Sequence, residues 1–477
     1  MAVTTPRTEI ATRFAPLLAR ARQRSSRFGR PFLASLTTHL GPVPDYDFAL
    51  LSEQPNAFIW EQPSRGLTLA GVGHAVRLTA AGASRFEDVR LQLQRLLDEA
   101  VISQDSGAAL KPAPLSFAGF AFDPEHPDDV AWFGFPDALA VLPRLLFVRS
   151  GAHLFLTVNL LASEDTDPSV VGDLAALAER LIAEAPDDRD LPSSSLLDPG
   201  PDAHAYWNES VRGLTAQIAH GEAEKVVLAR RIQVESRQPG FDTAAVLRRL
   251  RARYSECTLF AVRAGDACFA GATPEMLISL NRRKASADCL AGSARRGATP
   301  EEDAAIGAAL LADDKEHREH AFVARGLRES LGRLCSDVRM PAEPVLKRMA
   351  NVQHLHTPIE ATTNSDRHVL ELVEALHPSA ATAGLPRERS LCLIREQEPF
   401  SRGWYAGPIG WIDAEGGGEF AVALRSALLR DDVASLYAGC GIVTGSDPER
   451  EYAESEIKLA AMLYALNAEP GKGGSNA

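Results

Sequence analysis

A glycine-rich strand followed by a charged helix, over residues 437–458, has the residue types of a metal and anion site. Glu451, Glu454 and Lys458 follow Asp447-Pro448, and proline fits the first turn of a helix because its missing N–H is not needed there. Separations of three and four residues place both carboxylates and the ammonium on one helix face. A solvated surface face has the same pattern, so the spacing alone leaves both interpretations open.

A second acidic pair, Glu316 and Glu319 in the segment DDKEHREH, also lies on one face of a predicted helix. Mg²⁺ takes oxygen ligands, commonly one or two protein carboxylates together with waters and an anionic substrate. Two helices that bring such pairs to a common point would therefore suit Mg²⁺. His317 and His320 raise the alternative of zinc, but the segment matches neither HExxH nor HxxEH, the signatures of zinc hydrolases.

Three further side chains are candidates for catalysis or ligand binding. Lys225 opens the apolar strand KVVLA, where burial would favour the neutral amine of a general base; a solvent-exposed strand end is the alternative. Glu275 ends an apolar strand, where burial would keep it protonated as a general acid, although an ordinary turn glutamate has the same sequence context. Arg425 stands among small residues on one face of a predicted strand, GEFAVALRSALL, and would either bind a ligand carboxylate or cover a helix with its stem.

Strands and helices that would carry these residues are mixed along the whole chain, and the connections favour antiparallel strands. Apolar runs and alternation between turn residues predict strands over 31–38, 57–80, 115–124, 138–161, 224–234, 257–280, 284–290, 351–361, 403–413, 418–430 and 433–442. Helical periodicity predicts helices near the N-terminus and over 84–100, 170–185, 205–220, 243–254, 300–312, 314–335, 369–376 and the segment after Pro448.

Composition excludes several classes of protein. With 45% hydrophobic and 24% charged residues, the chain is typical of a globular protein. A net charge of −13 without a basic stripe argues against nucleic acid as a partner. No apolar run approaches the roughly 20 residues that cross a membrane, and the N-terminus lacks the apolar core of a secretory signal. Six cysteines without a CxxC pair predict reduced thiols in a cytoplasmic protein.

The Asp-, Pro- and Ser-rich segment 187–202 is the best candidate for a linker in the chain. It divides the sequence into an N-terminal part, 1–200, and a part with most of the chemical signals, 201–467. The last residues, 468–477 (AEPGKGGSNA), are predicted to be a disordered tail.

Nine motifs in the second part, in this order, resemble the chorismate-utilising enzymes, which include the isochorismate, salicylate, anthranilate and aminodeoxychorismate synthases. The motifs are KVVLAR, GATPEML, LAGSARRG, DKEHREH, NVQHLHTPI, HPSAATAGLP, RGWYAGPIGW, GEFAVALRSALL and YAGCGIVTGSDPEREYAESEIK. The resemblance implies an α+β fold with two stacked antiparallel β-sheets and outer helices. It also implies that segment 187–202 is an internal connection within one large unit.

The resemblance implies a role for each matching residue. Lys225 matches the base that activates water for attack at C2 of the chorismate ring, and Glu275 matches the acid that protonates the departing C4 hydroxyl. The residues matching Mg²⁺ ligands or their neighbours are Glu319, Glu454, Glu316 and Glu451. The residues matching substrate contacts are Tyr405 and Arg425 at the enolpyruvyl carboxylate, and Gly292, Ser293, His354, Gly441 and Lys458 elsewhere in the pocket. A dianionic substrate in an acidic protein needs such cations to offset its charge.

Ala381 in HPSAATAGLP stands where the amine-adding members and several lyases carry threonine, and Lys225 also resembles the members that use water. This combination resembles isochorismate synthases, and HLHTPI, AGLP and the long N-terminal part resemble the menaquinone type. The alternatives are a salicylate synthase, a siderophore-pathway isochorismate synthase and a non-catalytic chorismate-binding protein. No glutamine-amidotransferase partner is expected, and either a monomer or a homodimer is compatible with the sequence.

Overall fold

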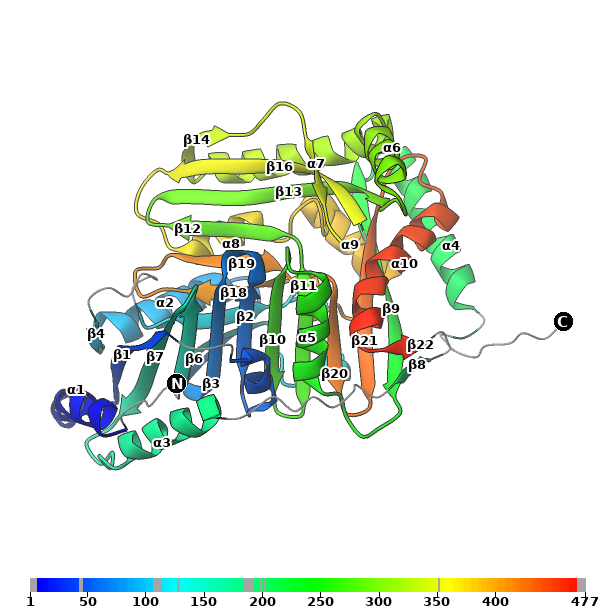
Figure 1. Ribbon diagram of the computed structural model, residues 1–477. Helices are drawn as coiled ribbons and strands as arrows, with labels where there is room; N and C mark the ends of the chain where they lie inside the picture. The colour runs from blue at the N-terminus through cyan, green and yellow to red at the C-terminus, as the bar shows by residue number, and fades with distance from the viewer. Residues whose placement is uncertain are drawn as a thin grey trace.

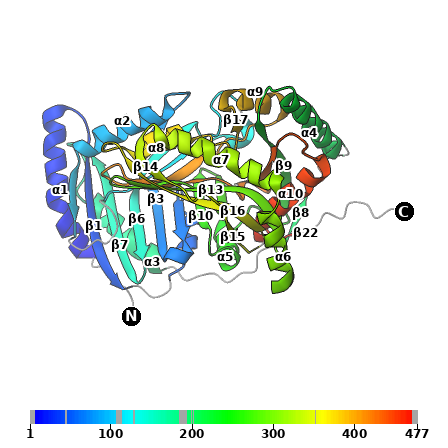
Figure 2. The ribbon, with the colours of Figure 1, turned by 90° about the horizontal axis from the view of Figure 1, so that it is seen from above.

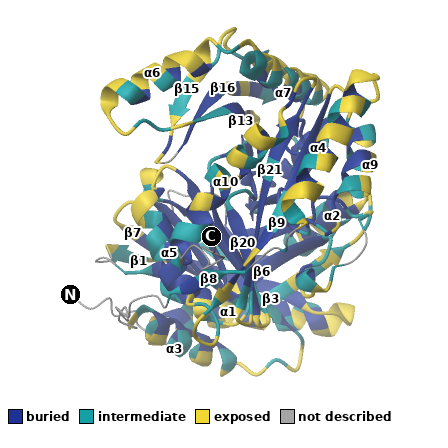
Figure 3. Ribbon diagram, turned by 90° about the vertical axis from the view of Figure 1, so that its right-hand side faces the viewer, coloured by how far each residue is buried: buried dark blue, intermediate teal, exposed yellow. Residues whose placement is uncertain are grey.

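The computed structural model describes residues 7–42, 46–105, 113–126, 129–183, 193–197, 200, 202–350 and 352–469. It has an α+β fold in which two mostly antiparallel sheets lie one above the other with helices outside (Figures 1 and 2). The predicted fold class is therefore confirmed. Strands are mainly buried, whereas helices such as α6 and α7 have exposed outer faces (Figure 3).

The first sheet is a long array whose neighbours are antiparallel, except for the pairs β1–β4 and β8–β22. Its strands in spatial order are β4 (Val101–Gln104), β1 (Phe32–Pro42), β7 (His153–Ala162), β6 (Ala138–Ser150), β3 (Leu67–Ala80), β2 (Phe58–Gln62), β10 (Thr258–Ala264), β11 (Ala267–Thr273), β20 (Ser426–Arg430), β21 (Val433–Ile442) and β9 (Lys225–Ser236). Strand β9 also pairs with β17 (Gly384–Leu385) and with β8 (Ser194–Leu196), which β22 (Ala468–Glu469) extends.

The second sheet crosses the upper part of the molecule in Figure 1. Its strands in spatial order are β5 (Ser116–Phe120), β18 (Pro408–Ile412), β19 (Gly418–Val422), β12 (Met276–Asn281), β13 (Lys284–Arg295) and β16 (Val352–Thr363), with β14 (Cys335–Arg339) and β15 (Val345–Arg348) both on β16. Strand β6 joins the two sheets, because residues 138–141 pair with β5 and residues 145–150 pair with β7.

Helices surround the sheets, with α1 at the β1 end and α4 and α9 at the other end (Figure 2). They are α1 (Arg7–Phe28), α2 (Arg85–Asp98), α3 (Val170–Ala183), α4 (Ala203–Ala219), α5 (Thr243–Arg253), α6 (Pro300–Leu311), α7 (Asp314–Gly332), α8 (Val369–Leu376), α9 (Arg387–Gln397) and α10 (Pro448–Ala465). The two acidic helices begin at aspartate caps: Asp313 accepts from the backbone N–H groups of Lys315 and Glu316, and Asp447 accepts from that of Arg450.

The single strand predicted over 418–430 is wrong. Its first part forms β19 in the second sheet, and its last part forms β20 in the first sheet. The chain turns between them at Arg425, whose φ is +48°. The sequence pattern shows no sign of this break. The small residues Ala421, Ala423 and Ala427 continue the alternation through the turn, and all three are buried.

Several shorter features also differ from the sequence expectations. Helix α9 and strands β14, β15 and β17 were not predicted, and helix α7 ends at Gly332, not at residue 335. The predicted tail begins too early, because residues 468–469 form β22 beside β8. The remainder of that tail and most of segment 187–202 lie outside the described residues.

The first 200 residues share both sheets with the rest of the chain. Strand β2 pairs with β10, β5 pairs with β18, and β8 pairs with β9. Side chains of the two parts also pack together. Gly119 on β5 leaves the space that the ring of Trp404, next to Tyr405, fills. The N-terminal part therefore supports a segment that lines the site described below.

Among the described residues, no helix combines the length and apolar character that crossing a membrane requires. All six cysteines are free thiols, and only Cys392 is exposed.

Gly119→Ala should destabilise the protein, because an added Cβ would lie 2.0 Å from Cζ3 of Trp404 and the buried ring would have to move. Overpacking of this kind costs about 1–3 kcal/mol, measurable as a lower free energy of unfolding in urea. Gly213→Ala on α4 is the matched control, because nothing lies within 4 Å of its added Cβ. Equal stability of Gly119→Ala and the wild type would contradict this packing.

Candidate active site

A cavity lies where both sheets meet α7 and α10. Every residue predicted from the sequence to be in the site lines this cavity, except Glu316 and Glu451 just beside it. The lining residues from that set are Lys225, Glu275, Gly292, Ser293, Glu319, His354, Ala381, Tyr405, Arg425, Gly441, Glu454 and Lys458. Residues distributed over more than 230 positions of the chain therefore meet in one place.

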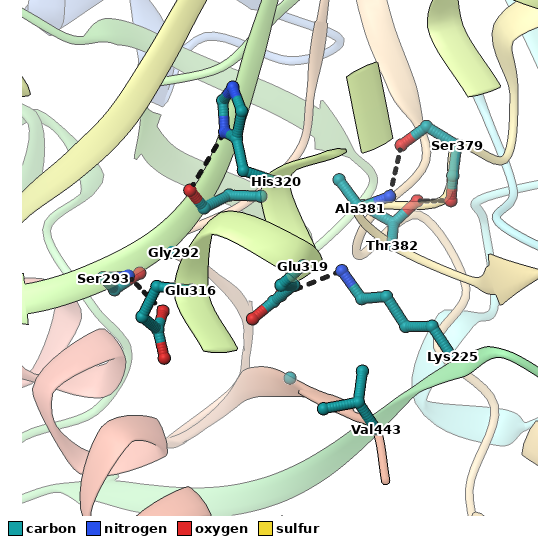
Figure 4. Close-up of polar contacts among 12 residues, drawn as sticks. Lys225, Gly292, Ser293, Glu316, Glu319, His320, Ser379, Ala381, Thr382 and Val443 are labelled. Atoms are coloured by element: carbon teal, nitrogen blue, oxygen red, sulfur yellow. Dashed lines mark hydrogen bonds and ion pairs between the residues drawn. The ribbon is translucent and has the colours of Figure 1, made fainter. Parts of the chain in front are cut away.

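Lys225 and Glu319 form the ion pair at the centre of the site. Lys225 begins β9 and is 1% exposed, and its Nζ donates to Glu319 Oε1 at 2.8 Å (Figure 4). Gly441 on the neighbouring β21 leaves room for this contact, because an added Cβ would lie 2.6 Å from both Glu319 Oε1 and Lys225 Cε. The partner of the buried ammonium was not foreseen from the apolar strand alone.

An acidic cluster forms where α7 faces α10. Burial and the charge of Glu319 raise the pKa of Glu316 to about 7. Burial also raises the pKa of Glu451, although the ammonium of Lys315 opposes this shift. Lys315, which the sequence reasoning missed, places its Nζ 3.1 Å from Glu451 Oε1 and 3.8 Å from Glu316 Oε1. Burial is the main cause of both raised pKa values, and the neighbouring carboxylates Glu319 and Glu454 add to it.

The donor set of this cluster fits Mg²⁺. Carboxylate oxygens of Glu451 and Glu454 lie within 4.8 Å of each other and of the Cys440 sulfur. Burial raises the pKa of Cys440, and its thiol donates to the Glu451 backbone carbonyl, so carboxylate oxygens are the available ligands. Lys458 holds Glu454 from the cavity side with an Nζ–Oε1 distance of 2.7 Å.

Glu275 is 7% exposed at the junction of β11 and β12. Burial raises its pKa to about 7, and the nearby Asp288 carboxylate adds to this shift. The backbone holds the residue firmly, because Val422 N–H donates to the Glu275 carbonyl at 3.1 Å and the Thr273 hydroxyl donates to the Val422 carbonyl. A carboxylic acid is thus kept ready to donate a proton near neutral pH.

Arg425 and Tyr405 form a cationic and aromatic end of the cavity. The turn between β19 and β20 directs Arg425 inward, and its buried Nη1 has no hydrogen-bond partner among the described residues. Tyr405 is buried and stacks on Tyr437 with ring centroids 5.1 Å apart. An unpaired guanidinium N–H is costly to bury, so this end of the cavity is suited to a ligand carboxylate.

A β-bulge in the wall of the cavity positions His354. Gly292 forms the bulge between β13 and β16 with φ +80°, and Ser293 N–H donates to Glu316 Oε2 at 3.2 Å (Figure 4). The Ser293 hydroxyl lies 2.9 Å from His354 Nδ1. Burial and the charge of Arg425 lower the pKa of His354 to about 3, so its imidazole is neutral at physiological pH.

The loop before β17 supplies Ala381, whose N–H donates to the Ser379 hydroxyl at 3.2 Å. Arg402, another lining residue that the sequence reasoning missed, donates to the carbonyls of Thr382 and Val227 at 2.8 and 2.7 Å. This arginine therefore ties the Ala381 loop to strand β9. The one sequence signal for this role of Arg402 is its position at the start of the motif RGWYAGPIGW.

The zinc alternative finds no support around His320. Its Nε2 lies 2.8 Å from the Thr357 hydroxyl and its Nδ1 lies 3.2 Å from the Ala291 carbonyl oxygen. Both ring nitrogens are therefore occupied within the protein. His317 Nε2 lies 2.8 Å from the carbonyl oxygen of Leu311, outside the cavity.

Gly441→Ala should separate Lys225 from Glu319, because the new methyl group would occupy the space of both side chains. A crystal structure of the variant should show a lengthened Nζ–Oε1 distance, and the free energy of unfolding should fall by about 1–3 kcal/mol. Gly213→Ala again serves as the control. A variant that keeps the 2.8 Å contact and wild-type stability would show that Gly441 is not required for the pair.

Comparisons with known proteins agree with this geometry. A salicylate biosynthesis isochorismate synthase of Pseudomonas aeruginosa is 36% identical over 94% of this chain and 93% of that relative. The isochorismate synthase MenF of Bacillus subtilis is 34% identical over 90% of this chain and 92% of that relative. The solved structure of MenF, the menaquinone-specific isochorismate synthase from Escherichia coli, matches with a TM-score of 0.74 at 27% identity, covering 94% of this chain and 99% of that one.

The family model described as chorismate binding enzyme matches residues 18–467, which include every residue of the cavity. The chain therefore belongs to the family of chorismate-binding enzymes.

Proposed function

We propose that this protein is a Mg²⁺-dependent isochorismate synthase, which converts chorismate to isochorismate. The observation that carries the proposal is the shared cavity of Lys225 and Glu275, a paired ammonium and a carboxyl group with a raised pKa. Relatives named as isochorismate synthases, similar over nearly their whole length, support the same activity. The intact set of ionisable residues argues against a purely binding role.

In the proposed reaction, Lys225 first passes its ammonium proton through Glu319 to solvent and then acts as the neutral amine. This amine takes a proton from a water molecule while the oxygen of that water bonds to C2 of the ring. The ring double bonds shift, and the C4 hydroxyl leaves as water with the proton that Glu275 donates. One proton is gained by the base and one is lost by the acid, so exchange with solvent restores both groups. The buried Glu275, with a pKa of about 7, is suited to this donation near neutral pH.

Substrate carboxylates would be held at two ends of the cavity. Arg425 and Tyr405 would bind the enolpyruvyl carboxylate, since the buried Nη1 of Arg425 offers a free donor. Glu319 and Glu454 would bind Mg²⁺, with Glu316 and Glu451 beside them. Bound there, Mg²⁺ would offset the charge of the ring carboxylate. Support for this placement comes from the crowded carboxylates and from the raised pKa of Glu316.

Water as the nucleophile is proposed from Ala381, whose small side chain lines the cavity. Because no ammonia is consumed, the proposed enzyme needs no amidotransferase subunit. We propose that it is cytoplasmic and either a monomer or a homodimer. We propose menaquinone biosynthesis as the pathway, since the relative MenF of Escherichia coli is specific for menaquinone. The salicylate biosynthesis relative of Pseudomonas aeruginosa, also an isochorismate synthase, makes salicylate biosynthesis the second candidate.

Incubation of the purified protein with chorismate and MgCl₂ should produce isochorismate as the only new product. A chelator should stop its formation, and added Mg²⁺ should restore it. Separation of the products by chromatography distinguishes the alternatives. Salicylate together with pyruvate would assign a lyase, and unreacted chorismate under all conditions would contradict the proposed activity.

Lys225→Ala should abolish turnover, because no other base on β9 reaches the cavity among the described residues. Loss of the partner of Glu319 should lower the free energy of unfolding by about 3–5 kcal/mol, as for other broken buried ion pairs. Circular dichroism should still show the wild-type fold. The exposed Lys284→Ala is the control and should retain full activity. Turnover by Lys225→Ala would remove lysine from the role of base.

A further inference from the structure

A second ionic cluster lies behind Glu275, outside the residues that line the cavity. Lys347 on β15 donates from Nζ to Asp288 Oδ2 on β13 at 3.0 Å. His356 Nε2 on β16 lies 2.8 Å from the other carboxylate oxygen of Asp288. All three side chains are half-buried, with exposed fractions of 28%, 23% and 16% for Lys347, Asp288 and His356. The proposed reaction uses none of them.

Lys347 also reaches the turn that carries the acid. Its Nζ lies 3.3 Å from the carbonyl oxygen of Pro274, the residue directly before Glu275. On the other side of the turn, the Thr273 hydroxyl bonds to the Val422 carbonyl. The Thr273–Glu275 turn is thus fastened to β19 at one end and, through Lys347, to β13 and β15 at the other.

Charges of both signs surround the Glu275 carboxyl group. The groups that face it are Lys225 on β9, Asp288 and Cys289 on β13, Lys347 on β15 and Lys458 on α10. Asp288 supplies the opposing negative charge, whereas the three lysines favour the carboxylate form. The cluster therefore contacts the turn directly through Lys347. Its two charges, on Lys347 and Asp288, act on the protonation of Glu275 in opposite directions.

We propose that Lys347 and Asp288 are positioning residues for Glu275: Lys347 anchors the Thr273–Glu275 turn, and Asp288 holds Lys347 in place and lies near the acid as a negative charge. The role rests on the proposed function, in which Glu275 donates a proton to the leaving hydroxyl. His356 completes the cluster by binding the second oxygen of Asp288. Replacement of either member should therefore change both the geometry and the protonation of the acid.

The two substitutions should shift the protonation of Glu275 in opposite directions. Asp288→Asn removes a negative charge and leaves Lys347 unneutralised, so the carboxylate form becomes easier to reach and the acid is lost at lower pH. Lys347→Met removes a positive charge and leaves Asp288 unneutralised, so the acid persists to higher pH. Lys347→Met should in addition lower kcat, because the turn loses its anchor. A purely structural role would not produce shifts of opposite sign.

The test is the pH dependence of kcat/KM for chorismate, measured from pH 5.5 to 9 at saturating Mg²⁺. In the wild type, activity should fall as the pH rises through about 7, because Glu275 must be protonated to act. Asp288→Asn should move this limb to lower pH and Lys347→Met to higher pH, each by roughly half a unit or more. Asp337→Asn and Lys284→Met remove the same charges at exposed positions, and should leave the limb in place.

Titration of the Glu275 carboxyl carbon by NMR separates this proposal from the proposed function. Selective ¹³C-labelling of glutamate, with Glu275→Gln for assignment, reports the protonation of the acid without any turnover. Opposite shifts in the two variants would support the proposal even if the wild type left chorismate unchanged. The positioning role would be overturned if the wild type were active but the fall of kcat/KM with pH stayed in place in both variants, or moved in the same direction in both. The proposed function would then still stand.

Discussion

The buried ammonium of Lys225 is the constraint on which the rest of the site depends. A charge this far from solvent is unfavourable unless it is paired, and Glu319 provides the partner at 2.8 Å. The pair joins β9 of the first sheet to α7, which packs on the second sheet. Gly441 leaves the space between them. The site therefore exists only where the two sheets are held in this arrangement.

Positive and negative side chains occupy different parts of the cavity. Carboxylates from α7 and α10 gather at one end, where burial and the charge of Glu319 raise the pKa of Glu316. At the other end, Arg425 has a buried donor without a partner among the described residues. Each end is incomplete by itself, and a divalent cation together with a dicarboxylate would complete both. The proposed Mg²⁺ would place positive charge among the carboxylates, and the proposed substrate would place a carboxylate beside Arg425.

The crossing of the chain between sheets explains why Arg425 points inward. Residues 418–422 belong to the second sheet and residues 426–430 to the first, so the residues between them must change direction. A left-handed φ at a residue other than glycine is uncommon, and such residues are often found at functional sites. The same transition brings Val422 next to Glu275, which links the acid to the end of the cavity that Arg425 forms.

The sequence by itself determined the features that depend on neighbouring residues. The faces of α7 and α10, their aspartate caps and most of the strands follow from local spacing, because helix and strand periodicities are set within a few residues. The nine ordered motifs also identified the family and twelve of the residues that line the cavity. Local rules could not divide the strand at Arg425, since small buried residues continue through the turn.

Only the tertiary structure decided which charges meet. Lys225 and Glu319 are 94 positions apart, and Asp288 and Lys347 are 59 apart, so no local periodicity connects them. Lys315 between the acidic helices and Lys347 behind Glu275 have no distinctive spacing, and both are recognised by their contacts alone. The physical reason is that ion pairing acts through space, and the packing of two sheets and their helices sets those distances.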